Sequence, residues 1–539
     1  MNAPKQISLL KGTSIVSSLT IVSRIFGFIR DLLVAKLFGA GFFADAFFVA
    51  FRIPNLLRSL AAEGALTSAF VPIFSSELEK GKDFAQQALK ATGSLIVKFV
   101  SALCVLSIIF SPEIVSMIAP GFTKNQAQFE LTVLLTRIML PYLLFISLIS
   151  MINGALNSVG IFGAASLSQI IVNLTLIIGA LLAGFYQDYS AAIILAISVP
   201  LGGFASIILQ IPFLKKASLY ILPTGKAVTK VTKEILKLML PAVFGAAVYQ
   251  VGIFLNTALA SVLSPGSVSW LFYSDRIVQF PIGVFTVALA SVLLPSLSRS
   301  EAKKSNQEFI TSIQDSIRFT SFIIIPTAFG LYYLAEPVAR IVFERGEFSA
   351  LDSKMTAISI KAFCFGLWSV SCHSMLVRAF LAKKDTRTPM FIGLASLVIG
   401  FIVSIFFMGQ AYRNQGWIGS LVDLIQSSAP NFVQSFGHVG LALGSIFYSF
   451  VSLILSVYIL LQRLEGFSLK SLIISSLKST IASVGMCLAI SKFFSVSSLS
   501  FIGLVLAILF GILIYIIISL ILQSSELKET FRRFSRLLK

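Results

Sequence analysis

Charged side chains are scarce in this 539-residue chain, where Asp, Glu, Lys and Arg together make up only 12% of the residues. Soluble globular proteins carry about 25%. Hydrophobic residues make up 56%, and the mean hydropathy is +0.92. The formal net charge of +19 would by itself suggest a nucleic-acid partner. A chain this apolar is not a soluble nucleic-acid-binding protein, and we expect no nucleic acid among its partners.

Cysteine and histidine are also few, with four and two copies. Cys104, Cys364, Cys372 and Cys487 lie in apolar segments and form no CxxC pair. This pattern excludes a disulfide framework and predicts no metal site. A GxxxxGK[ST] phosphate-binding loop is missing from the sequence, so we expect neither a cofactor nor coupling to ATP.

Long apolar segments, in contrast, are abundant. Runs of about 20 apolar residues have the length that crosses a bilayer as a helix. They predict an all-α polytopic membrane protein with about fourteen transmembrane helices. The predicted spans are residues 12–35, 40–71, 91–110, 131–156, 163–185, 191–212, 238–262, 268–297, 319–334, 357–382, 389–409, 438–461, 471–491 and 499–522.

The loops between these spans are charged asymmetrically. With the N-terminus placed in the cytoplasm, 25 Lys and Arg residues fall in the predicted cytoplasmic segments and 7 on the opposite side. Basic residues are enriched in cytoplasmic loops of membrane proteins. Both termini are therefore predicted to be cytoplasmic.

Two short motifs recur at almost the same spacing. Residues 71–75 (VPIFS) resemble residues 294–298 (LPSLS), 223 residues later, and residues 154–157 (GALN) resemble 378–381 (RAFL), 224 residues later. Such repeats are common in transporters, whose solute site lies between the halves. We expect residues 1–212 to form one six-helix lobe, 213–237 a basic cytoplasmic linker, 238–463 a second six-helix lobe, and 464–539 two further helices with a basic tail.

The first two spans carry charges at the depth of the membrane. Each charge near a helix centre costs roughly 2.5 to 3.5 kcal/mol, so these side chains should face protein or water. At 100° per residue, Arg24 and Asp31 lie about 20° apart on the helix. The charged residues are Arg24, Arg30 and Asp31 in the first span and Asp45, Arg52, Arg58 and Glu63 in the second.

These charges have a structural and a functional interpretation. They could pair internally, Arg30 with Asp45 for example, and merely hold helices together. Charge counting favours function, because adding Asp275 and Arg276 gives five arginines against four acids. Guanidinium groups suit phosphate, so the predicted solute is a phosphate-bearing anion. Gln250 and Asn256, in the span 238–262, are secondary candidates for the same cavity.

Several longer motifs are recognisable. Residues 23–31 (SRIFGFIRD), 44–51 (ADAFFVAF), 63–65 (EGA) and 266–270 (GSVSW) closely resemble the MurJ (MviN) family of lipid II flippases. The similarity covers essentially the whole chain, apart from a longer loop at 410–437. It implies the MOP exporter superfamily fold, in which two six-helix lobes form a V and two further helices form a groove for the lipid tail.

The resemblance also implies roles for individual residues. Arg24, Arg30 and Arg276 would line a cationic cavity and contact the diphosphate of lipid II. Asp31 would belong to the same cavity, and Arg52 would contribute a positive charge. The residues at gating or otherwise functional family positions are Ser23, Asp45, Arg58, Glu63, Gly64 and Asp275.

Together, these observations predict a monomeric flippase rather than an enzyme. It would move lipid II, an undecaprenyl-diphosphate-linked disaccharide pentapeptide, from the inner to the outer leaflet of the bacterial cytoplasmic membrane for peptidoglycan synthesis. Alternating access through the cationic cavity would carry the head group. The sequence leaves the energy source open among Na⁺, H⁺, Cl⁻ and the membrane potential.

Other functions were weighed against this one. A flippase for another polyprenyl-diphosphate oligosaccharide would need the same basic cavity, whereas a multidrug exporter of cations should have an acidic one. A glycosyltransferase would need a catalytic cluster of acids or histidines at a membrane face, and the sequence offers none. In a scaffold for cell-wall assembly, the arginines would be structural.

Overall fold

The computed structural model describes residues 9–59, 66–221, 228–411 and 416–528, and these residues form helices and no strand. By their internal contacts they divide into a first unit, drawn from residues 1–269 and 412–420, and a second unit, drawn from residues 270–411 and 421–539. Each unit is described separately below.

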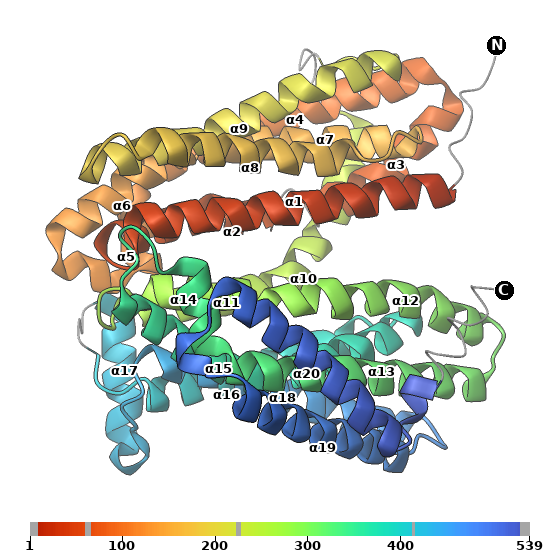
Figure 1. The fold of residues 1–539 in the computed structure, drawn as a ribbon. Helices are drawn as coiled ribbons and strands as arrows, with labels where there is room; N and C mark the ends of the chain where they lie inside the picture. Colours follow the sequence, from red (N-terminus) through yellow and green to blue (C-terminus); the bar gives the residue numbers. More distant parts are fainter. Residues whose placement is uncertain (1–8, 60–65, 222–227, 412–415, 529–539) are drawn as a thin grey trace. The chain divides into compact units, whose positions relative to one another are not determined.

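Among the described residues, ten α-helices lie wholly in the first unit, and Figure 1 labels them. They are α1 (Leu9–Phe38), α2 (Phe42–Arg58), α3 (Thr67–Lys80), α4 (Lys82–Ile109), α5 (Ser111–Ile118), α6 (Gln126–Met139), α7 (Tyr142–Ser158), α8 (Ala164–Ala183), α9 (Asp188–Lys216) and α10 (Lys230–Ser261).

The remaining α-helices are α11 (Ser267–Pro281), α12 (Val287–Ala302), α13 (Asn306–Tyr333), α14 (Ala335–Phe343), α15 (Ala350–Ala382), α16 (Arg387–Phe407), α17 (Gly416–Ser428), α18 (His438–Arg463), α19 (Lys470–Phe493) and α20 (Phe501–Ile521). A π-helical segment, Ile282–Thr286, separates α11 from α12. The helices α11 and α17 have residues in both units, and the others belong to the second.

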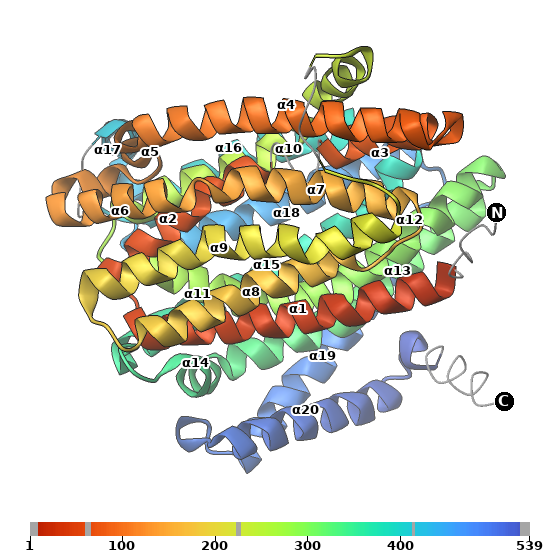
Figure 2. The same ribbon diagram turned by 90° about the horizontal axis from the view of Figure 1, so that it is seen from above.

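Small residues allow close helix packing in the first unit. Helix α8 packs against both α1 and α9, and Figure 2 shows the three helices side by side. A Cβ atom on Gly179 of α8 would lie only 2.6 Å from the Cβ of Ser198 in α9. Glycine therefore permits this approach, as is common between membrane helices, where packing rather than hydrophobic burial drives association.

Close packing of the same kind occurs in the second unit, where α16 and α18 make extensive contact. A Cβ atom on Gly400 would lie 2.8 Å from the carbonyl oxygen of Gly444. Helix α15 packs on α13 and α18, while α19 packs on α13 and α20, and Tyr515 of α20 also bonds the Phe322 carbonyl of α13. The two C-terminal helices are therefore attached to the second unit through α13.

Helix boundaries reveal the internal repeat clearly. Helices α4, α5 and α6 begin at residues 82, 111 and 126, and α13, α14 and α15 begin at 306, 335 and 350, each 224 residues later. The π geometry also recurs, because Ser59 after α2 adopts it 223 residues before Ile282. This spacing agrees with the offset between the repeated motifs of the sequence, and the predicted bounds of the two lobes and the linker stay a prediction. By this spacing α10 begins the second repeat, although it packs on α3 and α4 of the first unit.

Within the described residues, each of the fourteen predicted spans overlaps at least one helix. Among the described residues, ten helical spans are long and apolar enough to cross a membrane, or eleven if α13 and α14, bent by 71°, form one span. Helices α1, α2 and α10 are not among them. The chain is therefore a multi-pass membrane protein, and the number fourteen stays a prediction.

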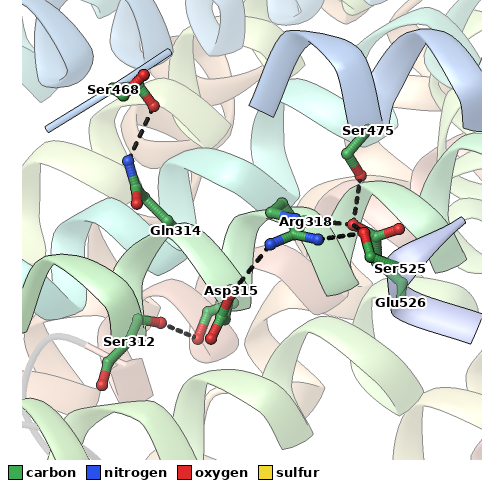
Figure 3. Close-up of polar contacts among 9 residues, drawn as sticks. Ser312, Gln314, Asp315, Arg318, Ser468, Ser475, Ser525 and Glu526 are labelled. Carbon is green, nitrogen blue, oxygen red and sulfur yellow. Dashed lines mark hydrogen bonds and ion pairs between the residues drawn. The ribbon is translucent and has the colours of Figure 1, made fainter. Parts of the chain in front are cut away.

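A polar cluster fastens the segment after α20 to α13 and α19 (Figure 3). Arg318 Nε of α13 donates to Glu526 Oε1 at 2.8 Å, and Arg318 also bonds the Ser525 hydroxyl. The Ser475 hydroxyl of α19 donates to the same Glu526 oxygen at 2.9 Å. Burial of Glu526 would raise its pKa, but its backbone, Ser475 and Arg318 outweigh burial and hold the pKa below the usual value.

Replacing Arg318 should loosen this attachment. In Arg318→Met, the Glu526 carboxylate, 3% exposed as a side chain, loses its cation, and we expect the free energy of unfolding in detergent to fall by about 1–3 kcal/mol. The natural pair should contribute fully above a carboxyl's ordinary pKa of about 4.3 and be lost as the pH falls through the lowered value. Lys492→Met, an exposed change in the last turn of α19, is the control. Equal unfolding midpoints for the two variants would contradict the attachment.

Candidate functional site

Arg30 of α1 is held in a fixed orientation within the first unit. Its Nε and Nη2 donate to Asp31 Oδ1 at 2.9 and 2.7 Å, and its Nη1 donates to Asn173 Oδ1 of α8 at 3.0 Å. Asn173 Nδ2 in turn donates to the Ser23 carbonyl at 3.1 Å. The structure thus brings together three residues that the sequence predicts as functional, Ser23, Arg30 and Asp31. The ion-pair partner of Arg30 is Asp31 rather than Asp45.

This arrangement leaves part of the Arg30 guanidinium available. An arginine has five N–H donors. Three are used by Asp31 and Asn173, so two make no hydrogen bond within the part of the chain that the structure describes. The side chain is 11% exposed, so a bound anion would be shielded from water on most sides. Such an oriented fork suits the paired oxygens of a phosphate.

Arg24 lies on the same helix but is exposed. It makes no ion pair or hydrogen bond with any side chain or carbonyl in the described ranges. The α1 helix therefore presents one cation positioned by the protein, Arg30, and one without a protein partner, Arg24. At the membrane depth that the sequence predicts for this helix, such a cation is costly unless it faces water or a ligand.

Asp45 of α2 has a different role, because it caps the start of α11. Its Oδ2 accepts from the Gly266 N–H at 2.7 Å, and its Oδ1 accepts from the N–H and hydroxyl of Ser269 at 2.9 and 2.5 Å. The first N–H groups of a helix have no partner within the helix, and a carboxylate there also meets the positive end of the helix dipole. Asp45, 2% exposed, satisfies two of these N–H groups from a distant part of the sequence.

The remaining charges of α2 lie farther along the helix. Arg52 donates through Nη1 to the Thr257 hydroxyl of α10, which connects two helices of the first unit. Arg58 is half-buried in the last turn of α2. On α10, Gln250 and Asn256 are also half-buried. The predicted residues Glu63 and Gly64 lie outside the described residues.

Asp275 and Arg276 lie on α11, within the second unit. The Arg276 guanidinium carbon lies 4.6 Å from the centre of the Phe272 ring, a cation–π contact. Asp275 is exposed and accepts from Gln279 Nε2 at 3.4 Å. We expected these residues to share a cavity with Arg24 and Arg30, and that sharing stays a prediction.

Two residues that bond the predicted site residues were not predicted from the sequence. Asn173 is a single amide in the apolar run of α8, and Ser269 is one hydroxyl among many near the start of α11. An isolated amide within a membrane span is a usable signal, because it needs a polar partner there. Nothing in the sequence distinguishes Ser269 from its neighbours. The described residues contain no group of three His, Cys, Asp or Glu that could hold a metal ion.

Many apolar spans, a repeat of two similar halves and intramembrane arginines define a polytopic α-helical transporter fold. Solved structures agree. The chain is similar to "Lipid II flippase MurJ, inward closed conformation", with a TM-score of 0.76 and 27% identity over 94% of this chain and 98% of that chain. It also shares its fold with an inward-facing multidrug resistance MATE family transporter of the MOP superfamily, with a TM-score of 0.62 and 15% identity over 84% of this chain and 98% of that chain.

Sequence comparisons identify the family. The model "Lipid II flippase MurJ" matches residues 34–511. The "Probable lipid II flippase MurJ" of Buchnera aphidicola subsp. Schizaphis graminum is 34% identical over 85% of this chain and 84% of its own length. The "Lipid II flippase MurJ" of Burkholderia cenocepacia is 33% identical over 73% and 77%. The chain belongs to the MurJ family of lipid II flippases, and its family is one of transporters rather than enzymes.

The cap that Asp45 provides can be tested by substitution. Asp45→Ala leaves the Gly266 and Ser269 N–H groups without their acceptor, so we expect the free energy of unfolding to fall by about 1–3 kcal/mol. Asp45→Asn keeps one oxygen acceptor and should lose less. The measurement is thermal unfolding in detergent, with Asp83→Ala, an exposed acid in the first turn of α4, as the control. An unchanged midpoint for Asp45→Ala would show that the cap is dispensable.

Proposed function

We propose that this protein flips lipid II across the cytoplasmic membrane, and that Arg24 and Arg30 bind its diphosphate. The observation that carries the proposal is the pair of cations on α1. Arg30 is oriented by Asp31 and Asn173 with two N–H donors left over, and Arg24 has no partner in the described residues. A purely structural role would use these donors within the protein.

The chemistry of lipid II fits the described helices. Its diphosphate needs donors and positive charge, which Arg24 and Arg30 of the first unit can supply. Its polyprenyl tail needs an apolar, lipid-facing surface. Helices α19 and α20 offer one, because α20 is apolar throughout and exposes large side chains such as Ile502 and Leu509.

In the proposed cycle, the head group enters from the cytoplasm, the arginines bind the diphosphate, and a change to an outward-open state releases it. Both termini are cytoplasmic in this proposal, and one copy of the chain is sufficient. The change of state would be supported by six further residues, namely Asp45, Arg52, Arg58, Glu63, Gly64 and Asp275. The driving force would be the membrane potential or a gradient of Na⁺, H⁺ or Cl⁻. Moving one charge across 100 mV is worth about 2.3 kcal/mol.

The first test uses cells depleted of their own flippase. The amount of lipid II accessible to a membrane-impermeant probe is measured with the natural chain, Arg24→Gln, Arg30→Gln or Lys36→Gln at equal abundance. We expect the natural chain and Lys36→Gln to restore exposure. Lys36 is an exposed cation in the last turn of α1 and serves as the control. Each arginine variant should lower the flipping rate by about tenfold or more, as loss of a charged hydrogen bond predicts.

The outcomes separate substrate from site. If the natural chain restores no exposure although it is folded in the membrane, lipid II is the wrong substrate, and another polyprenyl-diphosphate oligosaccharide becomes the leading alternative. If the arginine variants flip as well as Lys36→Gln does, the arginines are structural and the diphosphate is bound elsewhere.

A further inference from the structure

A second polar cavity lies within the first unit, between α7, α8 and the start of α3. Its volume is about 300 Å³. This is at the lower end for ligand pockets, which span roughly 300 to 1,000 Å³, and suits a single ring rather than a whole disaccharide pentapeptide. Its polar lining residues are Thr67, Ser150, Asn153, Asn157, Ser168 and Gln169.

The described lining of the cavity is polar and uncharged. No Asp, Glu, Lys, Arg or His is among the lining residues that the structure describes. An ionised group such as a diphosphate or a carboxylate would enter without a counter-charge, which is costly in a buried site. Amides and hydroxyls offer both donors and acceptors, so they can match neutral groups that also carry both.

Unused hydrogen-bonding groups surround this cavity. Gln210 of α9, which is fully buried, donates through Nε2 to Asn153 Oδ1 at 2.8 Å and to the Ser168 hydroxyl at 2.5 Å. Its Oε1 is buried without a partner in the described part of the chain. The Asn153 NH₂ group and the side chains of Asn157 and Gln169 likewise make no hydrogen bond among those residues. Buried polar groups normally have partners, so the Gln210 oxygen indicates a missing ligand or water, and the half-buried Asn153 and Gln169 amides offer further donors and acceptors.

The position of the cavity fits the path of a head group. Asn157 and Ala165, at one end, are exposed and flank the connection between α7 and α8, while Ser150 at the other end is buried. That connection is cytoplasmic in the predicted orientation, on the side where lipid II is made available. Val172 lines the cavity and is followed in α8 by Asn173, the residue that orients Arg30.

We propose that this cavity is a subsite for an uncharged, acetamido-bearing sugar ring of the lipid-linked head group, next to the arginines that bind the diphosphate. The proposal rests on the proposed function. Neutral amides and hydroxyls of the ring would pair with Asn153, Asn157 and Gln169. The peptide stem carries amides as well, but its ionised carboxylates and amine are poorly suited to an uncharged cavity.

The test fills the cavity without touching the arginines. Ala165→Trp places a large side chain at the exposed end, and Gln169→Leu removes an amide at nearly constant size. Ile178→Trp, an exposed change on α8 outside the lining, is the control. Binding of the purified full chain in detergent is measured for three probes, namely lipid II, lipid II without its peptide, and undecaprenyl diphosphate. Thermal unfolding of each variant confirms that it is folded.

We expect Ala165→Trp and Gln169→Leu to weaken binding of both sugar-bearing probes by about tenfold and to leave undecaprenyl diphosphate unchanged. If Ala165→Trp and Gln169→Leu bind each of the three probes as tightly as Ile178→Trp does, the subsite is wrong. A loss confined to the probe with peptide would also overturn it, in favour of a peptide site. Binding by the natural chain is measured first. If the natural chain binds none of the three probes, the proposed function itself is contradicted, whatever the variants do.

Discussion

The cost of placing a charge in a membrane is the constraint on which this structure depends. At roughly 2.5 to 3.5 kcal/mol for each central Arg or Asp, charges on α1 and α2 must be satisfied by protein, water or ligand. The first unit satisfies some of them internally, through the contact of Asp31 with Arg30 and the capping of α11 by Asp45. The donors that are not satisfied internally are the ones that point to a substrate.

The hydrogen-bond partners of charged residues also distinguish residues that sequence motifs do not. Asp45 and Arg30 both belong to characteristic sequence blocks, yet their surroundings differ. Asp45 accepts hydrogen bonds from the N–H groups and the hydroxyl at the start of α11, which indicates a structural joint. Arg30 is oriented but keeps donors in reserve, which indicates a binding group. The hydrogen-bond partners therefore distinguish a structural role for Asp45 from a binding role for Arg30, which the charges in the sequence alone do not distinguish.

Much of the fold was predictable because hydropathy and repeat spacing act over long stretches. Runs of about twenty apolar residues identify membrane helices, and the offset between residues 71–75 and 294–298 agrees within one residue with that of the later helix boundaries. Contacts such as Asn173 with Arg30, or Ser269 with Asp45, were beyond reach because they join residues 143 and 224 positions apart. The polar cavity was equally hidden, since Asn153 and Gln169 lie on different helices and neither is charged.

The π geometry at Ser59 and at Ile282 has a consequence for the history of the chain. An extra residue in one helical turn is a local irregularity that weakens the regular hydrogen-bond ladder, and such turns are frequent at functional sites. Its presence at positions 223 residues apart matches the spacing of the whole repeat. The simplest account is that a half-length ancestor already contained the wide turn before gene duplication. The irregularity would then be older than the differences between the halves, and selection would have kept it in both copies while their side chains diverged.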